Sequence, residues 1–265
     1  MGPIGLHGGG EFLPGDEPFL DALLEAAREP ALERASSCGR AGPDEPIRVV
    51  FVPTAAAGQR PDAAVRLGTS AFERVAAARN WPVRVEAALV VDAASAGAPS
   101  LAARIAAADV VYLPGGDPAV IPRVLPDTPV LRSILAARAR GAVIAGASAG
   151  AMALAPRTWT PAGMVPGLAL VDGLVVFPHA DAATWERRTA GFGPAIEAGL
   201  GILGLGERTG VLSAAGTTDW RVIGPGEVRW LPPGAAEPRV AIQGETLVLS
   251  GPASGPASDA RLAAE

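Results

Sequence analysis

The pentapeptide Gly146-Ala147-Ser148-Ala149-Gly150 has the residue types and spacing of a nucleophile elbow. It follows the apolar run 142–145, which predicts a buried strand, and it precedes residues 151–154, which predict the first turn of a helix. In that context the glycines permit a sharp turn that leaves the serine hydroxyl exposed at the edge of a sheet. We therefore expect Ser148 to be a catalytic nucleophile. The alternative is a small-residue turn without a chemical role.

A serine hydroxyl needs a base that accepts its proton, and that base needs an acid that orients it. The sequence has two histidines, His7 and His179. His179 follows a predicted strand at 174–177, so it can reach the same sheet edge as Ser148. His7 also ends a predicted strand, and the run 7–10 resembles the HGGG oxyanion motif of esterases, although it lies far from Ser148 in sequence. We expect His179 to be the general base, with His7 as the less favoured candidate.

Strands and helices alternate along the chain up to Ser148. Apolar runs predict strands at 4–7, 47–52, 83–91, 109–113 and 142–145. Helical periodicity or composition predicts helices at 16–28, 62–79, 100–108, 118–125 and 128–139. Strands that are apolar almost throughout indicate a parallel sheet covered on both faces, so the expected fold is a doubly wound α/β sheet. Ligands bind beyond the carboxyl ends of such strands, where the glycine turns at 8–10 and 115–116 and Ser148 should meet.

The remainder of the chain has shorter elements. Residues 155–170 predict a long loop, residues 184–200 a helix, and residues 251–265 a frayed tail. Short apolar runs between glycine and proline turns predict antiparallel strands near the C-terminus, at 202–205, 211–213, 220–223, 228–231 and 246–249. We expect residues 1–250 to form a single hydrolytic domain.

Five short segments, spread between Gly5 and about Gly226, carry a further pattern. They are Leu6–Glu11, Val111–Asp117, Gly146–Met152, Pro178-His179 and Gly204–Thr209. In this order they resemble the motifs of the peptidase E / cyanophycinase family of serine peptidases. That family has the class I glutamine-amidotransferase-like fold. The resemblance implies a serine peptidase that cleaves small peptides or isopeptides through an acyl-enzyme.

The resemblance also implies roles for individual residues. Ser148, His179 and Glu207 would form a Ser-His-Glu triad. The oxyanion hole would consist of the backbone N–H of Ala149 and that of Gly115 or Gly116, and glycine there lets the backbone approach a developing oxyanion.

Three charged residues are weaker candidates for binding substrate. Asp117 is expected to cap a helix rather than to bind substrate. Arg187 and Arg188 could hold a substrate carboxylate, or they could simply be solvated on their predicted helix.

The sequence also departs from the family. Members that cut β-linked aspartyl-arginine polymers have glutamines where this chain has Pro118 and Pro178, and phenylalanine is usual where Ala180 stands. The missing glutamines count against cleavage of cyanophycin itself, and the choice between an aspartyl dipeptide, a β-aspartyl isopeptide and another substrate stays open. Two other functions stay open: an α/β-hydrolase-type esterase that uses Ser148, Asp172 and His179, or an inactive member of the fold that binds a ligand.

Composition limits the class of partner. A net charge of −5 offers no basic surface for nucleic acid or an anionic membrane. No apolar window reaches the length of a membrane-spanning helix, and no signal peptide is visible, so a cytoplasmic protein is expected. Cys38 is the only cysteine, and with two histidines we expect no metal and no cofactor. The expected partner is a small peptide substrate, and a homodimer is possible.

Overall fold

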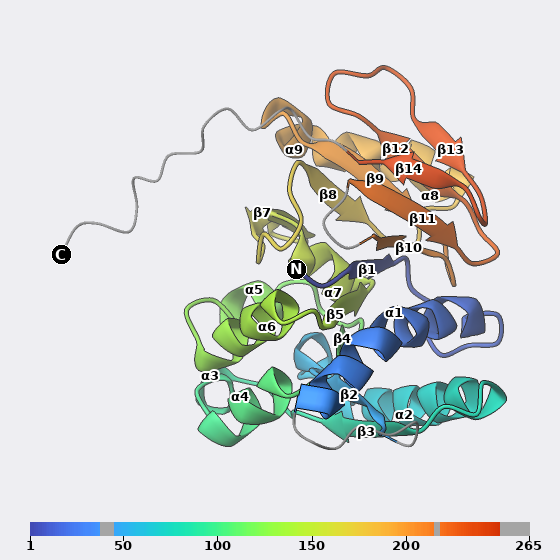
Figure 1. Ribbon diagram of the computed structural model, residues 1–265. Coiled ribbons are helices and arrows are strands. Elements are labelled where there is room, and N and C mark those ends of the chain that lie inside the picture. The colour runs from blue at the N-terminus through green and yellow to red at the C-terminus, as the bar shows by residue number, and fades with distance from the viewer. Residues whose placement is uncertain (38–44, 215–217, 250–265) are drawn as a thin grey trace.

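The computed structural model describes residues 1–37, 45–214 and 218–249, and an eight-stranded sheet runs through its centre (Figure 1). The strand order is β14-β11-β10-β1-β5-β4-β2-β3. In chain order these strands are β1 (Ile4–His7), β2 (Ile47–Phe51), β3 (Val83–Ala87), β4 (Val110–Leu113), β5 (Val143–Ala147), β10 (Gly210–Ser213), β11 (Asp219–Ile223) and β14 (Thr246–Val248). The tail 251–265 lies outside the described residues.

The half of this sheet from β1 to β3 is parallel, as its apolar strands predict. His7 of β1 lies opposite Ala147 of β5, and Leu113 of β4 lies opposite Gly146. The carboxyl ends of the three central strands therefore lie at one edge of the sheet. The turns that follow them, including Ser148, meet at that edge as expected.

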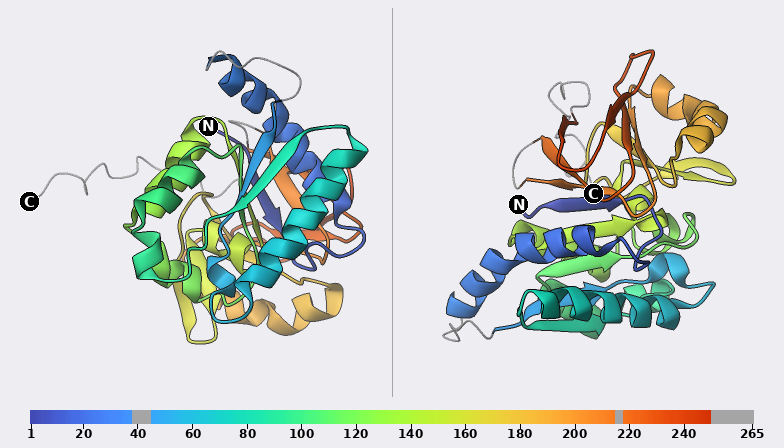
Figure 2. Two further views of the ribbon diagram at one scale, coloured as in Figure 1. Left: turned by 90° about the horizontal axis from the view of Figure 1, so that it is seen from below. Right: turned by 90° about the vertical axis from the view of Figure 1, so that its right-hand side faces the viewer.

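Helices cover both faces of the parallel half (Figure 2). On one face lie α1 (Glu17–Ser37) and α2 (Pro61–Ala78). On the other lie η1 (Thr54–Ala56), α3 (Ala93–Ala96), α4 (Pro99–Ala106), α5 (Val120–Val124) and α6 (Pro129–Ala139). Neighbouring strand residues supply the two cores: Val110 packs with the α1 and α2 side, and Val111 with the α4 and α6 side. Both faces of β1, β5, β4 and β2 are thus buried, whereas the edge strand β3 is only partly covered, and this arrangement confirms the doubly wound α/β fold.

A second sheet of four strands packs against the antiparallel half of the first (Figure 1). Its order is β13-β12-β9-β8, with bounds β8 (Leu174–Phe177), β9 (Gly201–Leu205), β12 (Val228–Leu231) and β13 (Arg239–Ala241). Leu203 and Trp230 of this sheet share a core with Trp220 of the first. β13 was not predicted. β9 pairs with β12 in the antiparallel sense, as expected for these short strands, but it also pairs in parallel with β8.

The outer face of the second sheet is covered by three short helices instead of the single helix expected at 184–200. They are α8 (Ala182–Arg188), η2 (Thr189–Phe192) and α9 (Gly193–Glu197). Gly191 and the pair Gly193-Pro194 interrupt the helical run, because glycine destabilises a helix interior and proline is tolerated only in a first turn. Phe177, Trp185 and Phe192 form the core beneath these helices.

The prediction of a long loop at 155–170 is wrong. The segment contains a β-hairpin, β6 (Arg157–Thr160) and β7 (Gly163–Pro166). The hairpin is fixed to the end of α7 (Ala149–Leu154), because the Thr158 hydroxyl donates to the carbonyl of Met152 at 3.1 Å. The N–H of Leu168 donates to the carbonyl of Ala153 at 2.8 Å.

Within the described residues no helix is long and apolar enough to cross a membrane.

Candidate active site

Ser148 stands at the turn between β5 and α7, in a conformation that side chains rarely adopt (φ 47°, ψ −114°). The two flanking glycines are required by close backbone contacts. A Cβ on Gly150 would lie 1.9 Å from the carbonyl oxygen of Leu113, and one on Gly146 would lie 2.5 Å from the carbonyl carbon of Gly150. The turn therefore has the sequence and the backbone strain of a nucleophile elbow.

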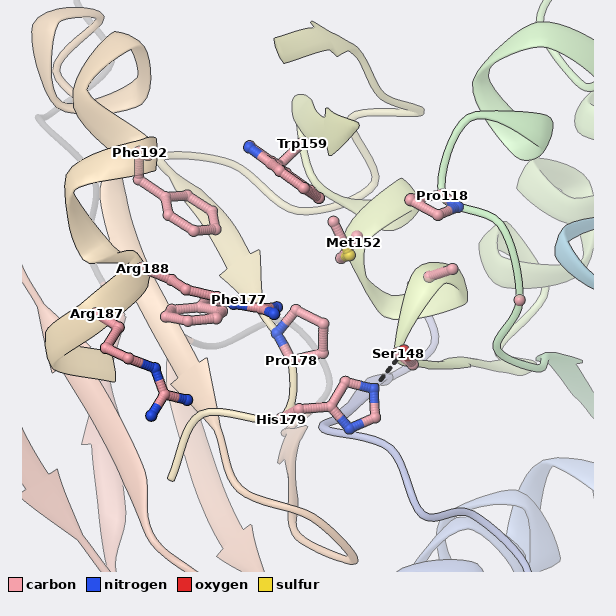
Figure 3. Close-up of a pocket in the computed structure, with 13 residues that line it drawn as sticks. Pro118, Ser148, Met152, Trp159, Phe177, Pro178, His179, Arg187, Arg188 and Phe192 are labelled. Atoms are coloured by element: carbon pink, nitrogen blue, oxygen red, sulfur yellow. Dashed lines mark hydrogen bonds between the residues drawn. The ribbon is translucent and has the colours of Figure 1, made fainter. Parts of the chain in front are cut away.

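The side chains of Ser148, His179 and Glu207 lie in one hydrogen-bonded row. Ser148 Oγ is 2.9 Å from His179 Nε2 (Figure 3), and His179 Nδ1 is 3.0 Å from Glu207 Oε1. His179 and Glu207 follow β8 and β9, which pair in parallel, so the two residues leave the second sheet at the same edge. Their side chains are 46% and 55% exposed, which leaves the row open to solvent.

The glycine turn after β1 holds this row together through its backbone. The carbonyl of His7 accepts the N–H of Ser148 at 2.9 Å, and the carbonyl of Gly8 accepts that of His179 at 2.9 Å. The carbonyl of Gly9 accepts the N–H of Arg208 at 2.7 Å, beside Glu207. A Cβ on Gly9 would lie 2.2 Å from Cε1 of His179, so the turn must be glycine to pass beneath the imidazole.

The His7 imidazole lies in the core and does not reach Ser148. It is fully buried, and its Nδ1 accepts the N–H of Gly9 at 3.3 Å. Its Nε2 lies 2.8 Å from Oδ1 of Asp16, at an angle outside hydrogen-bond geometry, and its ring packs on Phe19. His7 therefore contributes packing and its backbone carbonyl to the site, rather than a base.

Asp172, the acid of the esterase alternative, precedes β8 and so lies at the end of that strand opposite to His179. Its carboxylate interacts electrostatically with Arg138. Burial lowers the pKa of the Arg138 guanidinium, and the Asp172 carboxylate opposes that shift. The structure does not bring Asp172 to the imidazole.

Two backbone N–H groups beside Ser148 are available to a developing oxyanion, and a third is already occupied. The N–H of Gly115 donates to Glu11 Oε1 at 2.8 Å, so Gly115 does not fit the role that the sequence allowed it. Gly116 and Ala149 line the cavity beside Ser148, and their N–H groups have no partner among the described residues. The contact between Glu11 and the turn at Gly115 was not predicted from the sequence.

Asp117 is exposed and does not line that cavity. Its Oδ1 accepts the N–H of Ala119 at 2.9 Å, so the side chain closes the turn before α5. Ala119, not Asp117, is the N-cap residue of α5. A substrate contact by Asp117 has no support in this geometry.

A cavity of about 520 Å³ opens beside Ser148 and His179. Its walls include four large apolar side chains that the sequence did not single out, namely Met152, Trp159, Phe177 and Phe192 (Figure 3). Arg187 and Arg188 also line it, as the sequence allowed, and neither forms an ion pair with a described carboxylate. Within the described ranges no three His, Cys, Asp or Glu side chains gather in a way that could hold a metal ion.

A serine at a strand-to-helix turn, next to a histidine that contacts a carboxylate, is the arrangement of serine hydrolases. The model of peptidase family S51 matches residues 40–214. The chain belongs to this family and is a serine peptidase, which confirms the resemblance to the peptidase E family.

Solved structures show the same fold. A crystal structure of a peptidase from an acI-B1 Actinobacterium is 22% identical, with a TM-score of 0.72, over 94% of this chain and 97% of that one. A putative peptidase E protein from Listeria monocytogenes EGD-e is 16% identical, with a TM-score of 0.55, over 84% of this chain and 98% of the other. No curated protein sequence matches the chain.

Proposed function

We propose that this peptidase hydrolyses small peptides or isopeptides through an acyl-enzyme formed on Ser148. In this proposal His179 is the general base and Glu207 orients it. The observation that carries the proposal is the continuous row from Ser148 Oγ to His179 Nε2 and from His179 Nδ1 to Glu207 Oε1. A cavity of about 520 Å³ suits a short substrate better than a folded protein.

In the proposed reaction each step uses one of these groups. Ser148 Oγ attacks the substrate carbonyl carbon while its proton passes to His179 Nε2, and the carbonyl oxygen becomes an oxyanion. The imidazolium then gives that proton to the leaving amine as the C–N bond breaks, which leaves an ester on Ser148. Water, deprotonated by the same nitrogen, then attacks the ester carbonyl carbon; the bond from that carbon to Ser148 Oγ breaks, the imidazolium returns its proton to Oγ, and the acid is released. Glu207 stabilises the imidazolium and fixes its tautomer in both halves of the reaction.

The N–H groups of Gly116 and Ala149 would bind the oxyanion. Both belong to residues that line the cavity, and neither N–H is used by the fold in the described part of the chain. A donor of this kind contributes about 3 kcal/mol to lowering the barrier.

Arg187 and Arg188 would attract a substrate carboxylate to the cavity. Arg187 Nη2 makes a 3.3 Å hydrogen bond to Thr184 Oγ1 and interacts electrostatically with the Asp181 carboxylate, without an ion pair, and both arginine side chains are exposed. A guanidinium without an ion-pair partner can hold a carboxylate with two parallel hydrogen bonds. A free C-terminal carboxylate, as in a dipeptide, fits this role.

Labelling with a fluorophosphonate probe tests the nucleophile. The wild-type protein should be labelled on Ser148, and Ser148→Ala should lose both labelling and peptide hydrolysis while keeping its thermal unfolding curve. Ser100→Ala is the matched control, because Ser100 is exposed on α4, away from the cavity, and its loss should change neither signal. Labelling that persists in Ser148→Ala would remove the basis of the proposed mechanism.

A further inference from the structure

The cavity beside Ser148 has an apolar interior and a cationic mouth. Met152 and Phe177 are 5% and 4% exposed, and Phe192 is 4% exposed, so these side chains form deep walls. Trp159, at 37% exposed, projects from the β6–β7 hairpin over the same cavity. Figure 3 shows the indole nitrogen of Trp159 directed toward Phe192, with Met152 between Trp159 and Ser148.

These walls are held rigidly. The rings of Phe177 and Phe192 are 5.0 Å apart, and Phe177 also stacks on Trp185 at 5.8 Å, so the η2 side is part of a packed core. On the other side, the hydrogen bond from Thr158 to Met152 fixes the hairpin strand that carries Trp159. A preformed apolar cavity favours an apolar ligand group, because little ordering is needed on binding.

The residues that line the cavity disfavour charged side chains of a substrate. Among the lining residues the charged groups are Arg187 and Arg188, with no carboxylate, so a lysine or arginine side chain of a substrate would meet like charge. Both arginines are exposed, whereas Met152, Phe177 and Phe192 offer no donor to a carboxylate. An aspartate side chain packed against these three side chains would therefore lose hydration without receiving a hydrogen bond from them.

We propose that the substrate residue that enters this cavity, next to the scissile bond, has a large apolar side chain, and that Trp159 sets this preference. Phenylalanine, leucine and methionine are the side chains of matching size and polarity. The inference rests on the proposed function of Ser148, and it adds the substrate class. The carboxylate of such a peptide would stay at the mouth, near the arginines.

The test compares hydrolysis of dipeptides with free termini, Xaa-Ala and Ala-Xaa, where Xaa is Phe, Leu, Met, Ala, Asp or Lys. At one of the two positions kcat/KM should be at least about tenfold higher for Phe, Leu or Met than for Ala, Asp or Lys. Trp159→Ala should bring the ratio of Phe to Ala substrates close to one, mainly through KM, and Trp159→Phe should restore most of it.

Arg157→Ala is the matched control, because Arg157 is exposed on the same face of β6 but does not line the cavity. It should keep the wild-type ratio. Two outcomes would overturn this inference: a preference for Asp or Lys at both positions, or a ratio of kcat/KM for Phe to Ala substrates that is unchanged in Trp159→Ala. If labelling still depends on Ser148 in that case, the proposed function stands. Hydrolysis or labelling that does not depend on Ser148 would overturn both.

Discussion

Three residues in and beside the site hold backbone conformations that side chains rarely adopt. Ser148, His179 and Arg208 have φ values of 47°, 54° and 54°. Each such conformation costs on the order of 1–3 kcal/mol, and it persists because surrounding contacts fix it. Here the contacts are the three carbonyls of the turn from His7 to Gly9, which accept the N–H groups of these same residues. At the scale of residues, three of the seven described non-glycine residues with a positive φ lie at the site, where the side chains of Ser148 and His179 must be oriented.

Glu207→Gln should lower kcat by several orders of magnitude, because the amide can present the wrong hydrogen-bonding group to His179 Nδ1 and removes the charge that stabilises the imidazolium. Asp172→Asn should stay close to wild type, since Asp172 lies at the opposite end of β8. Both variants are to be assayed on the same dipeptide. If Asp172→Asn is the inactive one, the order Ser-Asp-His of the esterase alternative gains the support that Glu207 loses.

Gly9→Ala should reduce kcat strongly without unfolding the protein, because the new Cβ would lie 2.2 Å from Cε1 of His179 and displace the ring. Gly244→Ala is the control: Gly244 also has a positive φ, but a Cβ there meets nothing within 4 Å. The two variants separate backbone strain from displacement of the imidazole. Similar losses of kcat in both would show that the close approach beneath His179 is not what matters.

Among the elements, α1 shows how a tertiary contact can override a local signal. The sequence predicts a helix that ends at 28, before Pro30, because proline removes a helical hydrogen bond. The observed helix continues to Ser37. Its last turns are held by Arg34, whose Nε and Nη2 each donate to the Asp109 carboxylate at 2.9 Å. The Asp109 carboxylate raises the pKa of the Arg34 guanidinium.

Arg34→Met should lower the free energy of unfolding by about 3 kcal/mol, because it leaves the buried Asp109 carboxylate without its cation. Arg34→Met combined with Asp109→Asn should recover part of the loss, since the amide oxygen can still accept the N–H of Arg48, now bonded at 2.8 Å. Urea unfolding of the three proteins measures this. Equal midpoints for the wild type and Arg34→Met would refute the role given to the pair.

Some parts of the fold could be predicted from the sequence, and others could not. The parallel strands were predictable because burial on both faces leaves continuous apolar runs, such as Val110–Leu113. The β6–β7 hairpin was not, because Arg157–Thr160 alternates exposed and buried residues over only four positions. The row of Ser148, His179 and Glu207 was predicted from motifs, whereas the apolar cavity walls come from four separate elements that no local pattern links.

At the scale of the whole molecule, the decline of stability above about pH 10 should depend strongly on one buried side chain. Tyr112 is the only tyrosine, and the chain contains no lysine. Tyr112 is fully buried, and its hydroxyl has no hydrogen-bond partner in the described part of the chain. Burial, followed by the negative charges of Asp16 and Glu11, raises the pKa of Tyr112 well above its ordinary value.

A raised pKa means that the folded protein keeps a proton that the unfolded chain releases. Tyr112 therefore contributes stability that is fully present below about pH 10 and is lost as the pH rises further, by up to about 1.4 kcal/mol per pH unit. Tyr112→Phe should be close to neutral at pH 7 and should flatten that decline. Unfolding free energies from pH 8 to 11 measure it, and an equally steep decline in both proteins would contradict the assignment.

The proposed catalytic row joins two sheets: Ser148 comes from the eight-stranded sheet, and His179 and Glu207 come from the four-stranded one. Neither sheet can carry out the reaction by itself, so competence requires that the two have docked around the glycine turn. Contacts between segments distant in sequence form slowly. A chain that refolds from denaturant should therefore regain its far-ultraviolet circular dichroism before it regains reactivity toward the fluorophosphonate, and the delay between the two signals would time the docking of the sheets.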